Sequence, residues 1–416
     1  MPTRSPPSKR LPLRAALFAL ASALCASSAL AHEPGSELIP EVRGWRIDAA
    51  AALRAAESDG RWPVAALPGA PGLGVAPRRA EGELRMEHAT LGAALRLNAS
   101  FGTQWVVGRH DRDKPHTESA LLQARWAMGA DMLALNLGRD TVRMGSTLDG
   151  AGHIDRFSQA PLAKRGALDD QWIDDGLTLR WQRDVERGLR TLEAGLWRGR
   201  SFPGGPAGAP VPTLRAHGGW AHWDLQLFAS HLEPEARGSA MQSAGAEGHL
   251  HGSLDCRASL AQRVCFDGRS EILGASLRWD RDDGALSASL AALLRQERGA
   301  LYSLSSTADY RATTAGWWAD VNWSPWQDWT LAARAERLVP RNRLSGAGST
   351  QLAREAGLLA GQPVDRLSIA VLRQLGWGTQ LALETGSEKS PAEGGRINHV
   401  ALRLILRAPD LLKGRW

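Results

Sequence analysis

Cysteine, tyrosine and lysine are scarce in this sequence, and the chain beyond residue 31 contains no long apolar run. There are 3 cysteines, 2 tyrosines and, among 50 basic residues, only 5 lysines. A membrane-spanning helix needs about 18 or more consecutive apolar residues, whereas the mean hydropathy of the chain is −0.27. The sequence therefore excludes a helical membrane protein. Because lysine is so rare, the abundant arginine can reflect base composition as well as function.

The first 31 residues have the features of a secretory signal. Lys9, Arg10 and Arg14 precede the apolar run "AALFALASALCASSAL", which ends in Ala29-Leu30-Ala31. This pattern predicts a leader cleaved after Ala31, too short and wrongly flanked to remain as a membrane span. Its removal takes away four positive charges and no negative one, so the formal net charge falls from +6 to +2. The remaining charge is interspersed, which argues against a nucleic-acid partner.

Two cysteines and two histidines form the most prominent local cluster of the mature chain. "GHLHGSLDCRASLAQRVCF" contains His249, His251, Cys256 and Cys265. An exported protein meets an oxidising compartment, and the eight intervening residues allow a closed loop, so we expect a Cys256–Cys265 disulfide. The alternative is a tetrahedral zinc site formed by the two thiolates with the two imidazoles. Weak metal binding by the histidines alone also stays open.

From residue 82 onward, apolar and polar residues alternate with a period of two. Near the end of the chain, Leu402 and Leu406 alternate with Arg403 and Arg407, and segments such as "ALLQARWAM", "GLTLRWQR" and "GWWADVNW" repeat the pattern. Strict alternation predicts half-buried strands. We count about 14–16 strands of roughly 9–11 residues, an even number suiting a closed antiparallel bacterial barrel. Pro409 interrupts the last strand, which therefore closes at Arg407 or continues, bent, to Trp416.

The connections between these strands distinguish a membrane barrel from a soluble sandwich, which would alternate too. Short polar turns alternate with long polar connections, which is the layout of an outer-membrane barrel with short periplasmic turns and long extracellular loops. We therefore predict an all-β protein, a single transmembrane antiparallel barrel over residues 82–416. Residues 32–81 are rich in Pro and Gly without periodicity. They are expected to form an N-terminal extension, a linker rather than a periplasmic tail or a plug.

The polar face of the predicted strands carries more arginine than acid. The acids on it are Asp224, Asp320 and Glu336. The arginines are Arg96, Arg125, Arg180, Arg278, Arg334, Arg403 and Arg407. In a barrel this face lines the lumen, and its charge predicts a preference for anions. The competing interpretation is that these arginines pair with neighbouring acids and select nothing.

A long connection over residues 140–173 is the strongest candidate for a functional loop. It leaves one strand and enters no other for some thirty residues, and such connections are usually functional or disordered. The basic residues of the wider segment 136–176, which includes this connection, are Arg139, Arg143, Arg156, Lys164 and Arg165. If the loop folds inward, these side chains form a constriction that filters solutes. If it faces outward, it is a solvated surface loop, and the sequence leaves both alternatives open.

The leader, the alternating Trp-rich strands and the "LGR" strand end before a long charged loop resemble Gram-negative outer-membrane porins, broadly the phosphate-selective porin-like group. The resemblance is architectural and covers most of residues 82–416. It implies passive diffusion of small solutes or ions through an outer-membrane channel, surrounded by lipid and assembled as a homotrimer. The chain departs from the group in its few tyrosines and in lacking a terminal Phe.

The expected function is therefore a porin with no cofactor. One alternative is an outer-membrane barrel that binds or imports a specific ligand such as a metal ion through His249 and His251. Another is a secreted soluble β-rich binding module. No GxSxG, HExxH or P-loop spacing occurs, so we expect no enzyme. A hydrolase with a Ser–His pair in the barrel wall stays open, because triad members need not be close in sequence.

Overall fold

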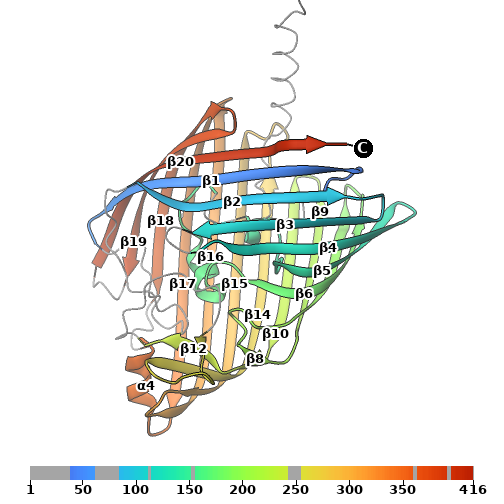
Figure 1. Ribbon diagram of the computed structural model, residues 1–416. Helices are drawn as coiled ribbons and strands as arrows, with labels where there is room; N and C mark the ends of the chain where they lie inside the picture. The colour runs from blue at the N-terminus through green and yellow to red at the C-terminus, as the bar shows by residue number, and fades with distance from the viewer. Residues whose placement is uncertain are drawn as a thin grey trace, which may run out of the picture.

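The computed structural model of the protein describes residues 38–60, 84–110, 114–150, 155–241, 254–358, 363–390 and 395–415. Within these ranges, sixteen long antiparallel strands form one closed barrel (Figure 1). They are β1 (Gly44–Ser58), β2 (Arg85–Arg96), β3 (Phe101–His110), β4 (His116–Met128), β5 (Asp131–Thr141), β6 (Ile173–Arg183), β7 (Gly188–Trp197), β9 (Val211–Trp220), β10 (Trp223–Leu232), β14 (Arg263–Asp280), β15 (Leu286–Tyr302), β16 (Thr307–Trp326), β17 (Trp329–Ser345), β18 (Val364–Gly376), β19 (Thr379–Ser390) and β20 (Gly395–Gly414). The predicted fold class is confirmed. The expected leader, residues 1–31, lies outside the described residues.

The barrel closes at β1, which pairs with β2 on one side and with β20 on the other, as Figure 1 shows. This pairing corrects the boundary expected at residue 82, because residues 44–58 of the supposed extension form a strand of the wall. Their run "AAAALRAA" favours helix in isolation. Two flanking strands with unpaired edges override that preference, since a closed sheet leaves no edge exposed. Residues 61–81 of the expected extension lie outside the described residues.

Side chains of the wall alternate between an apolar outer face and a mostly polar inner face. On β20, Leu402 is 50% exposed, whereas Arg403 is fully buried inside. On β16, Trp317 is 40% exposed on the outside and Trp318 is fully buried inside. This is the distribution expected when the outer face contacts lipid. None of the helices in the described part of the chain is long and apolar enough to cross a membrane.

The two ends of the barrel differ in the length of their connections. At the short-turn end, connections such as 129–130, 221–222 and 377–378 contain two residues, and both β1 and β20 have their outer termini there. At the long-loop end lie the connections 142–172, 198–210, 233–262 and 346–363. The first of these contains α2 (Ser146–Asp149) and α3 (Leu162–Leu168), and the last contains α4 (Ser349–Glu355). Small sheet pieces extend this end: β8 (Ala207–Gly208), β11 (Pro234–Glu235), β12 (Arg237–Ala240) and β13 (Leu254–Asp255).

The last strand bends at Pro409 rather than ending before it. Its register against β1 shifts between Ile47 and Ala49, and Asp410 adopts a positive φ of 53°. The Asp410 backbone N–H donates to the Asp48 carboxylate at 2.9 Å, which satisfies a donor that the irregular ladder leaves without a strand partner. The strand therefore continues to Gly414. Trp416 lies outside the described residues.

Candidate functional site in the barrel lumen

The connection between β5 and β6 folds into the barrel and packs on the inner wall. We call residues 142–172 the inner segment; its residues 151–154 are not described. Its apolar side chains form one buried cluster with inward-facing residues of the wall. From the segment the cluster takes Val142, Met144, Leu148, Ala163, Ala167, Leu168 and Trp172, and from the wall it includes Phe228, Ile272, Leu293 and Trp318. Of the two arrangements that the sequence leaves open, the structure adopts the inward one.

Close packing of α3 on the wall depends on a glycine. Helix α3 contacts β15, β16 and β17. Gly316 of β16 lies under Ala163, and a Cβ added at Gly316 would stand 2.7 Å from the Cβ of Ala163. Real Cβ atoms do not approach this closely, so the helix can reach the strand only because position 316 has no side chain. The short green helical turns inside the ring of strands in Figure 1 belong to this segment.

Buried ion pairs hold the polar backbone of the inner segment. Arg334 on β17 bonds bidentately to Asp320 on β16, at 2.6 and 3.0 Å, and donates to Asp155 of the segment at 3.1 Å. Arg366 on β18 pairs with Glu336 at 2.8 Å and donates to the Ala160 carbonyl at 2.7 Å. Bidentate guanidinium pairs are among the strongest polar contacts in proteins. They compensate part of the cost of burying these charges.

Other wall side chains complete the backbone hydrogen bonds of the segment. The Glu336 carboxylate accepts the Leu162 N–H at 2.6 Å, which satisfies a donor in the first turn of α3. Glu384 on β19 accepts the Ser158 N–H at 2.7 Å, and Arg403 donates to the Asp155 carbonyl at 3.0 Å. Arg295 on β15 donates to the Ala167 carbonyl at 3.0 Å. The segment is therefore fixed by the wall along most of its described length.

The inner segment also holds itself together. The Asp149 carboxylate accepts the N–H groups of Met144 and Gly145 at 3.0 and 2.9 Å, and Lys164 donates to the Asp149 carbonyl at 3.1 Å, which links α2 to α3. Burial raises the pKa of Asp169, at the end of α3, to about 7, and the negative charge of Asp170 raises it further. The segment thus carries a carboxyl group whose charge changes near neutral pH.

The seven arginines predicted to line the lumen do face inward, but they have different partners. Arg403 pairs with Glu87 at 2.8 Å and Arg278 with Asp280 at 2.8 Å, while Arg334 has the carboxylates described above. Arg180 lies opposite Glu193 in the register of β6 and β7. Most of these side chains therefore have an acidic neighbour, as the competing interpretation of the arginine-rich face anticipated.

Arg96, Arg125 and Arg407 bond instead to neutral oxygens. Arg407 donates to the Gln380 amide oxygen at 3.4 Å. Arg96 donates to the carbonyl of Pro40 at 2.8 Å and to the Gln123 amide oxygen at 2.7 Å. Arg125 donates to the carbonyls of Ala99 and Glu41. Arg96 and Arg125 act electrostatically on each other, and the Glu41 side chain is an acid within range of Arg96.

The carbonyls of residues 40 and 41 belong to a second element inside the barrel. Residues 38–41, ahead of β1, enter the lumen at the short-turn end, and Ile39 packs with inward-facing Ala94 and Leu121. This part of the expected extension behaves as a plug-like insertion, the alternative that the sequence disfavoured. Arg96 and Arg125 anchor it through its carbonyl oxygens.

Of the basic residues expected in a constriction, some lie on the inner segment and one does not. Arg143 is buried near Asp140 at 3.6 Å, Arg156 is partly exposed beside Asp155 at 3.7 Å, and Arg165 is half-buried on α3. Arg139 was wrongly predicted as a loop residue. It lies on β5, on the same outer face as the exposed Leu137, and pairs with Asp175 at 3.3 Å. The strand continues two residues further than the break in apolar alternation suggested.

The cluster of cysteines and histidines is described only in part. Cys256 and Cys265 are joined by a disulfide with a Cα–Cα distance of 6.1 Å, and it ties β14 to the connection that precedes it. His249 and His251 lie outside the described residues. With both sulfurs in the disulfide, no thiolate is left for the alternative zinc site.

Three of the wall residues that hold the inner segment were missed in the sequence. Glu384, Arg295 and Arg366 occupy polar positions of strands that were predicted by their apolar face alone. Charged residues at successive inward positions, Arg295 and Glu297 in "ALLRQERG", were the available signal. Their partners are 128 to 226 residues away in the chain, a pairing that one sequence does not reveal.

No protein-family model and no curated protein matches this sequence. Several solved structures do match it. OmpT of Vibrio cholerae in a trimer form aligns with a TM-score of 0.51 at 10% identity, covering 87% of this chain and 99% of that chain. OmpF of Salmonella typhi, in complex with daunomycin, aligns with a TM-score of 0.51 at 10% identity, covering 88% of this chain and 98% of that chain. OprB of Pseudomonas putida aligns with a TM-score of 0.50 at 11% identity, covering 88% of this chain and 94% of that chain.

Proposed function

We propose that this chain, which has the fold of the outer-membrane porins, is a channel for passive diffusion of small hydrophilic solutes. The observation that carries the proposal is the closed barrel with an apolar outside and a polar inside, narrowed by an inward-folded segment. A lipid-facing surface needs apolar side chains, and a water-filled path needs polar ones. The apolar outer face argues against a secreted soluble module.

The proposed channel prefers anions. Paired arginines such as Arg334 and Arg403 contribute little net potential, because a carboxylate lies against each. Arg96 and Arg125 bond to neutral oxygens, so their charge is offset less completely. Arg156 is partly exposed on the inner segment, and it acts electrostatically on Arg407, as Asp155 does with the opposite sign. These groups would concentrate anions along the path.

The proposed setting is the outer membrane, reached by export with the leader 1–31. The short-turn end faces the periplasm and the long-loop end faces the outside, following the usual layout of such barrels. A homotrimer is the proposed assembly, supported by the trimer form of the Vibrio cholerae protein with the same fold. No catalytic step and no cofactor enter this proposal.

Planar lipid bilayers provide the test. Purified protein is expected to give discrete conductance steps. Across a salt gradient, the sign of the reversal potential should show that anions are more permeant than cations. Conductance steps with a reversal potential that shows cation preference would support the channel proposal but overturn the proposed role of Arg96 and Arg125. A protein that needs no detergent, shows no shift between boiled and unboiled gel samples and gives no steps would overturn the channel itself.

A further inference from the structure

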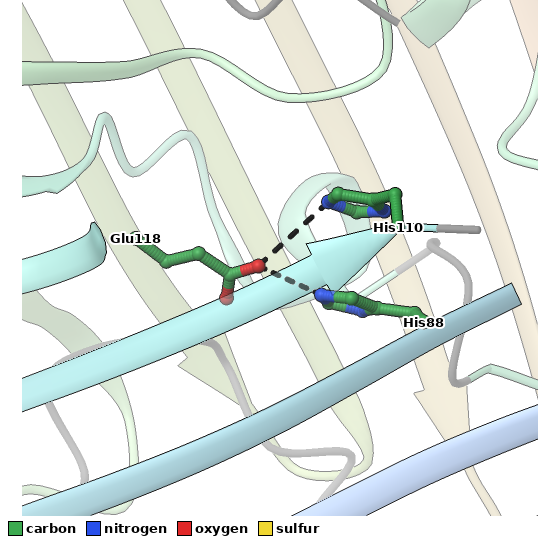
Figure 2. A group of neighbouring side chains, drawn as sticks. All are labelled: His88, His110 and Glu118. Atoms are coloured by element: carbon green, nitrogen blue, oxygen red, sulfur yellow. Dashed lines mark hydrogen bonds and ion pairs between the residues drawn. The ribbon is translucent and has the colours of Figure 1, made fainter. Parts of the chain in front are cut away.

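Three histidines and one glutamate meet on the inner face of the wall at the long-loop end. His88 comes from β2, His110 from the end of β3, and His116 and Glu118 from the start of β4. The Nε2 atoms of the three imidazoles lie 2.7, 3.7 and 3.9 Å from one oxygen, Glu118 Oε1. Figure 2 shows His88 and His110 directed at that carboxylate. All of these side chains except that of His116 are buried.

The backbone arranges this convergence. His88 and His110 are directly opposite each other on β2 and β3, and their rings stack with centroids 4.1 Å apart. The His116 ring follows at 5.3 Å from that of His110. Three neighbouring strands therefore present their imidazoles in one row, each with its Nε2 within 3.9 Å of the same carboxylate oxygen.

A bulge on β4 and a glycine on β3 allow Glu118 to join the row of histidines. The register of β4 against β3 shifts between Val106 and Val107, which leaves Glu118 as an extra residue of a bulge on the inner face. Bulges re-aim side chains in this way. The carboxylate then lies over Gly108 of β3, where a Cβ would overlap it. Position 108 must lack a side chain for Glu118 to reach His88 on the far strand.

The donor set has the chemistry of a transition-metal site. Zn²⁺ binds imidazole nitrogen and carboxylate oxygen at about 2.0–2.2 Å. Tetrahedral ligands at that distance stand roughly 3.3 Å apart, close to the observed separations of 3.7 and 3.9 Å. The His88–Glu118 hydrogen bond of 2.7 Å would open slightly to admit the ion. His88, His110 and Glu118 also meet as a group whose ligand atoms all lie within 4.8 Å of one another.

Nearby charges keep Glu118 available to the histidines. The adjacent acid on β2, Glu87, is engaged by Arg403 at 2.8 Å and Arg54 at 3.2 Å. Glu118 Oε1 lies within ion-pair range of all three imidazoles. We propose that His88, His110, His116 and Glu118 bind a divalent transition-metal cation, for which Zn²⁺ is the probe.

The test is Zn²⁺ binding to the full mature protein in detergent, measured by calorimetry. The wild type is expected to bind one Zn²⁺ per barrel at this site. The double variant His88→Ala/His110→Ala should weaken that binding by at least about tenfold, since it removes two ligands. Glu118→Gln, which preserves the shape of the side chain, should weaken it as well. Co²⁺ in place of Zn²⁺ should give visible absorption bands in the wild type and lose them in both variants.

Two control variants locate the site. His222→Ala removes an exposed histidine at the short-turn end, paired with Asp282 at 3.0 Å, and should leave binding unchanged. His249→Ala/His251→Ala removes the loop histidines and should also leave it unchanged. The shift between boiled and unboiled gel samples reports folding of every variant. Absence of Zn²⁺ binding in the wild type, its persistence in folded His88→Ala/His110→Ala, or its loss only in the loop variant overturns the proposal. None of these readouts depends on channel activity.

Discussion

Arg334 on strand β17 and Asp155 on the inner segment are 179 residues apart in the chain, yet the guanidinium Nη2 donates to the carboxylate Oδ2 at 3.1 Å inside the barrel. The same guanidinium holds Asp320 of the neighbouring strand and stacks on Phe157 of the segment, with Cζ 4.6 Å from the ring centroid. One side chain thus joins two strands to the element that narrows the lumen.

Arg334→Ala should destabilise the barrel and release part of the inner segment. It leaves Asp320 buried without its cation and removes one of the two cations beside Asp155, whose other is Arg156, a loss of about 3–5 kcal/mol. The unfolding temperature read from the heat-dependent gel shift should fall, and single-channel current should become noisier. Arg278→Ala is the matched control, because its pair with Asp280 is more than a third exposed and contributes below about 1 kcal/mol. Equal stability of the two variants would contradict the anchoring role.

Arg96→Gln/Arg125→Gln should shift the reversal potential toward cations, because two positive charges leave the path while neutral donors remain for the carbonyls of Pro40 and Glu41. Lys413→Gln also removes a cation, but from an exposed side chain on the last strand, and should change selectivity little.

Deletion of residues 38–43 tests the plug-like insertion separately. It should raise conductance, and unchanged conductance would show that these residues do not narrow the path.

Leu402→Arg should impair assembly, because it places a charge on the face that we assign to lipid. Arginine near the middle of a bilayer costs about 2–4 kcal/mol in a membrane barrel. Trp377→Arg, in a turn where the side chain is 91% exposed, should be tolerated. Urea unfolding in lipid vesicles measures both variants. If Leu402→Arg were as stable as the turn variant, the outer face would be facing water.

Acidification from pH 8 to pH 6 should strengthen anion preference. The pKa of Asp169 is raised to about 7, with burial as the main cause, Asp170 adding to it, and Arg165 and Arg295 opposing it. The carboxyl is therefore mostly charged at pH 8 and mostly neutral at pH 6, so the lumen loses negative charge as the pH falls. Reversal potentials at both values measure this. Histidines titrate in the same range, so the difference between wild type and Asp169→Asn isolates the effect of this group.

The disulfide should protect the connection before β14 without holding the barrel. In the mature wild type, neither Cys256 nor Cys265 should be alkylated unless a reductant is present. Cys256→Ser/Cys265→Ser should leave the barrel folded and speed trypsin cleavage at the exposed Arg257, within the bridged loop. A disulfide that closes a short loop stabilises a protein by roughly 2–3 kcal/mol. Here we expect that stabilisation to act mainly on the bridged loop. Alkylation of untreated protein would contradict the pairing.

The alternation of Leu402 with Arg403 shows what the sequence predicts well. Period-two patterns assign the two faces of a strand without knowledge of its partners, and the exposures of these two residues match the predicted faces. Strand β1 was missed because its signal is weak: alanine is small and favours helix. Its strand form comes from β2 and β20, which are far away in the chain.

The interior was predicted less well than the wall, for two physical reasons. Long-range pairs such as Ser158 with Glu384 depend on the fold of the whole barrel. A bulge also shifts the period of β4 locally, so that Glu118 converges with His88 although no fixed spacing links them. A motif search cannot find a cluster that depends on a register shift.

The contacts of the inner segment also constrain the order of assembly. Asp155 and Ser158 bond to Arg403 and Glu384, which are synthesised more than two hundred residues later. Contacts this distant in sequence form late, because the intervening chain must first be ordered. The segment can therefore reach its final place only after the last strands have joined the sheet. We therefore expect a closed barrel without the docked inner segment to precede the native state. Docking of the segment would be the last step of folding.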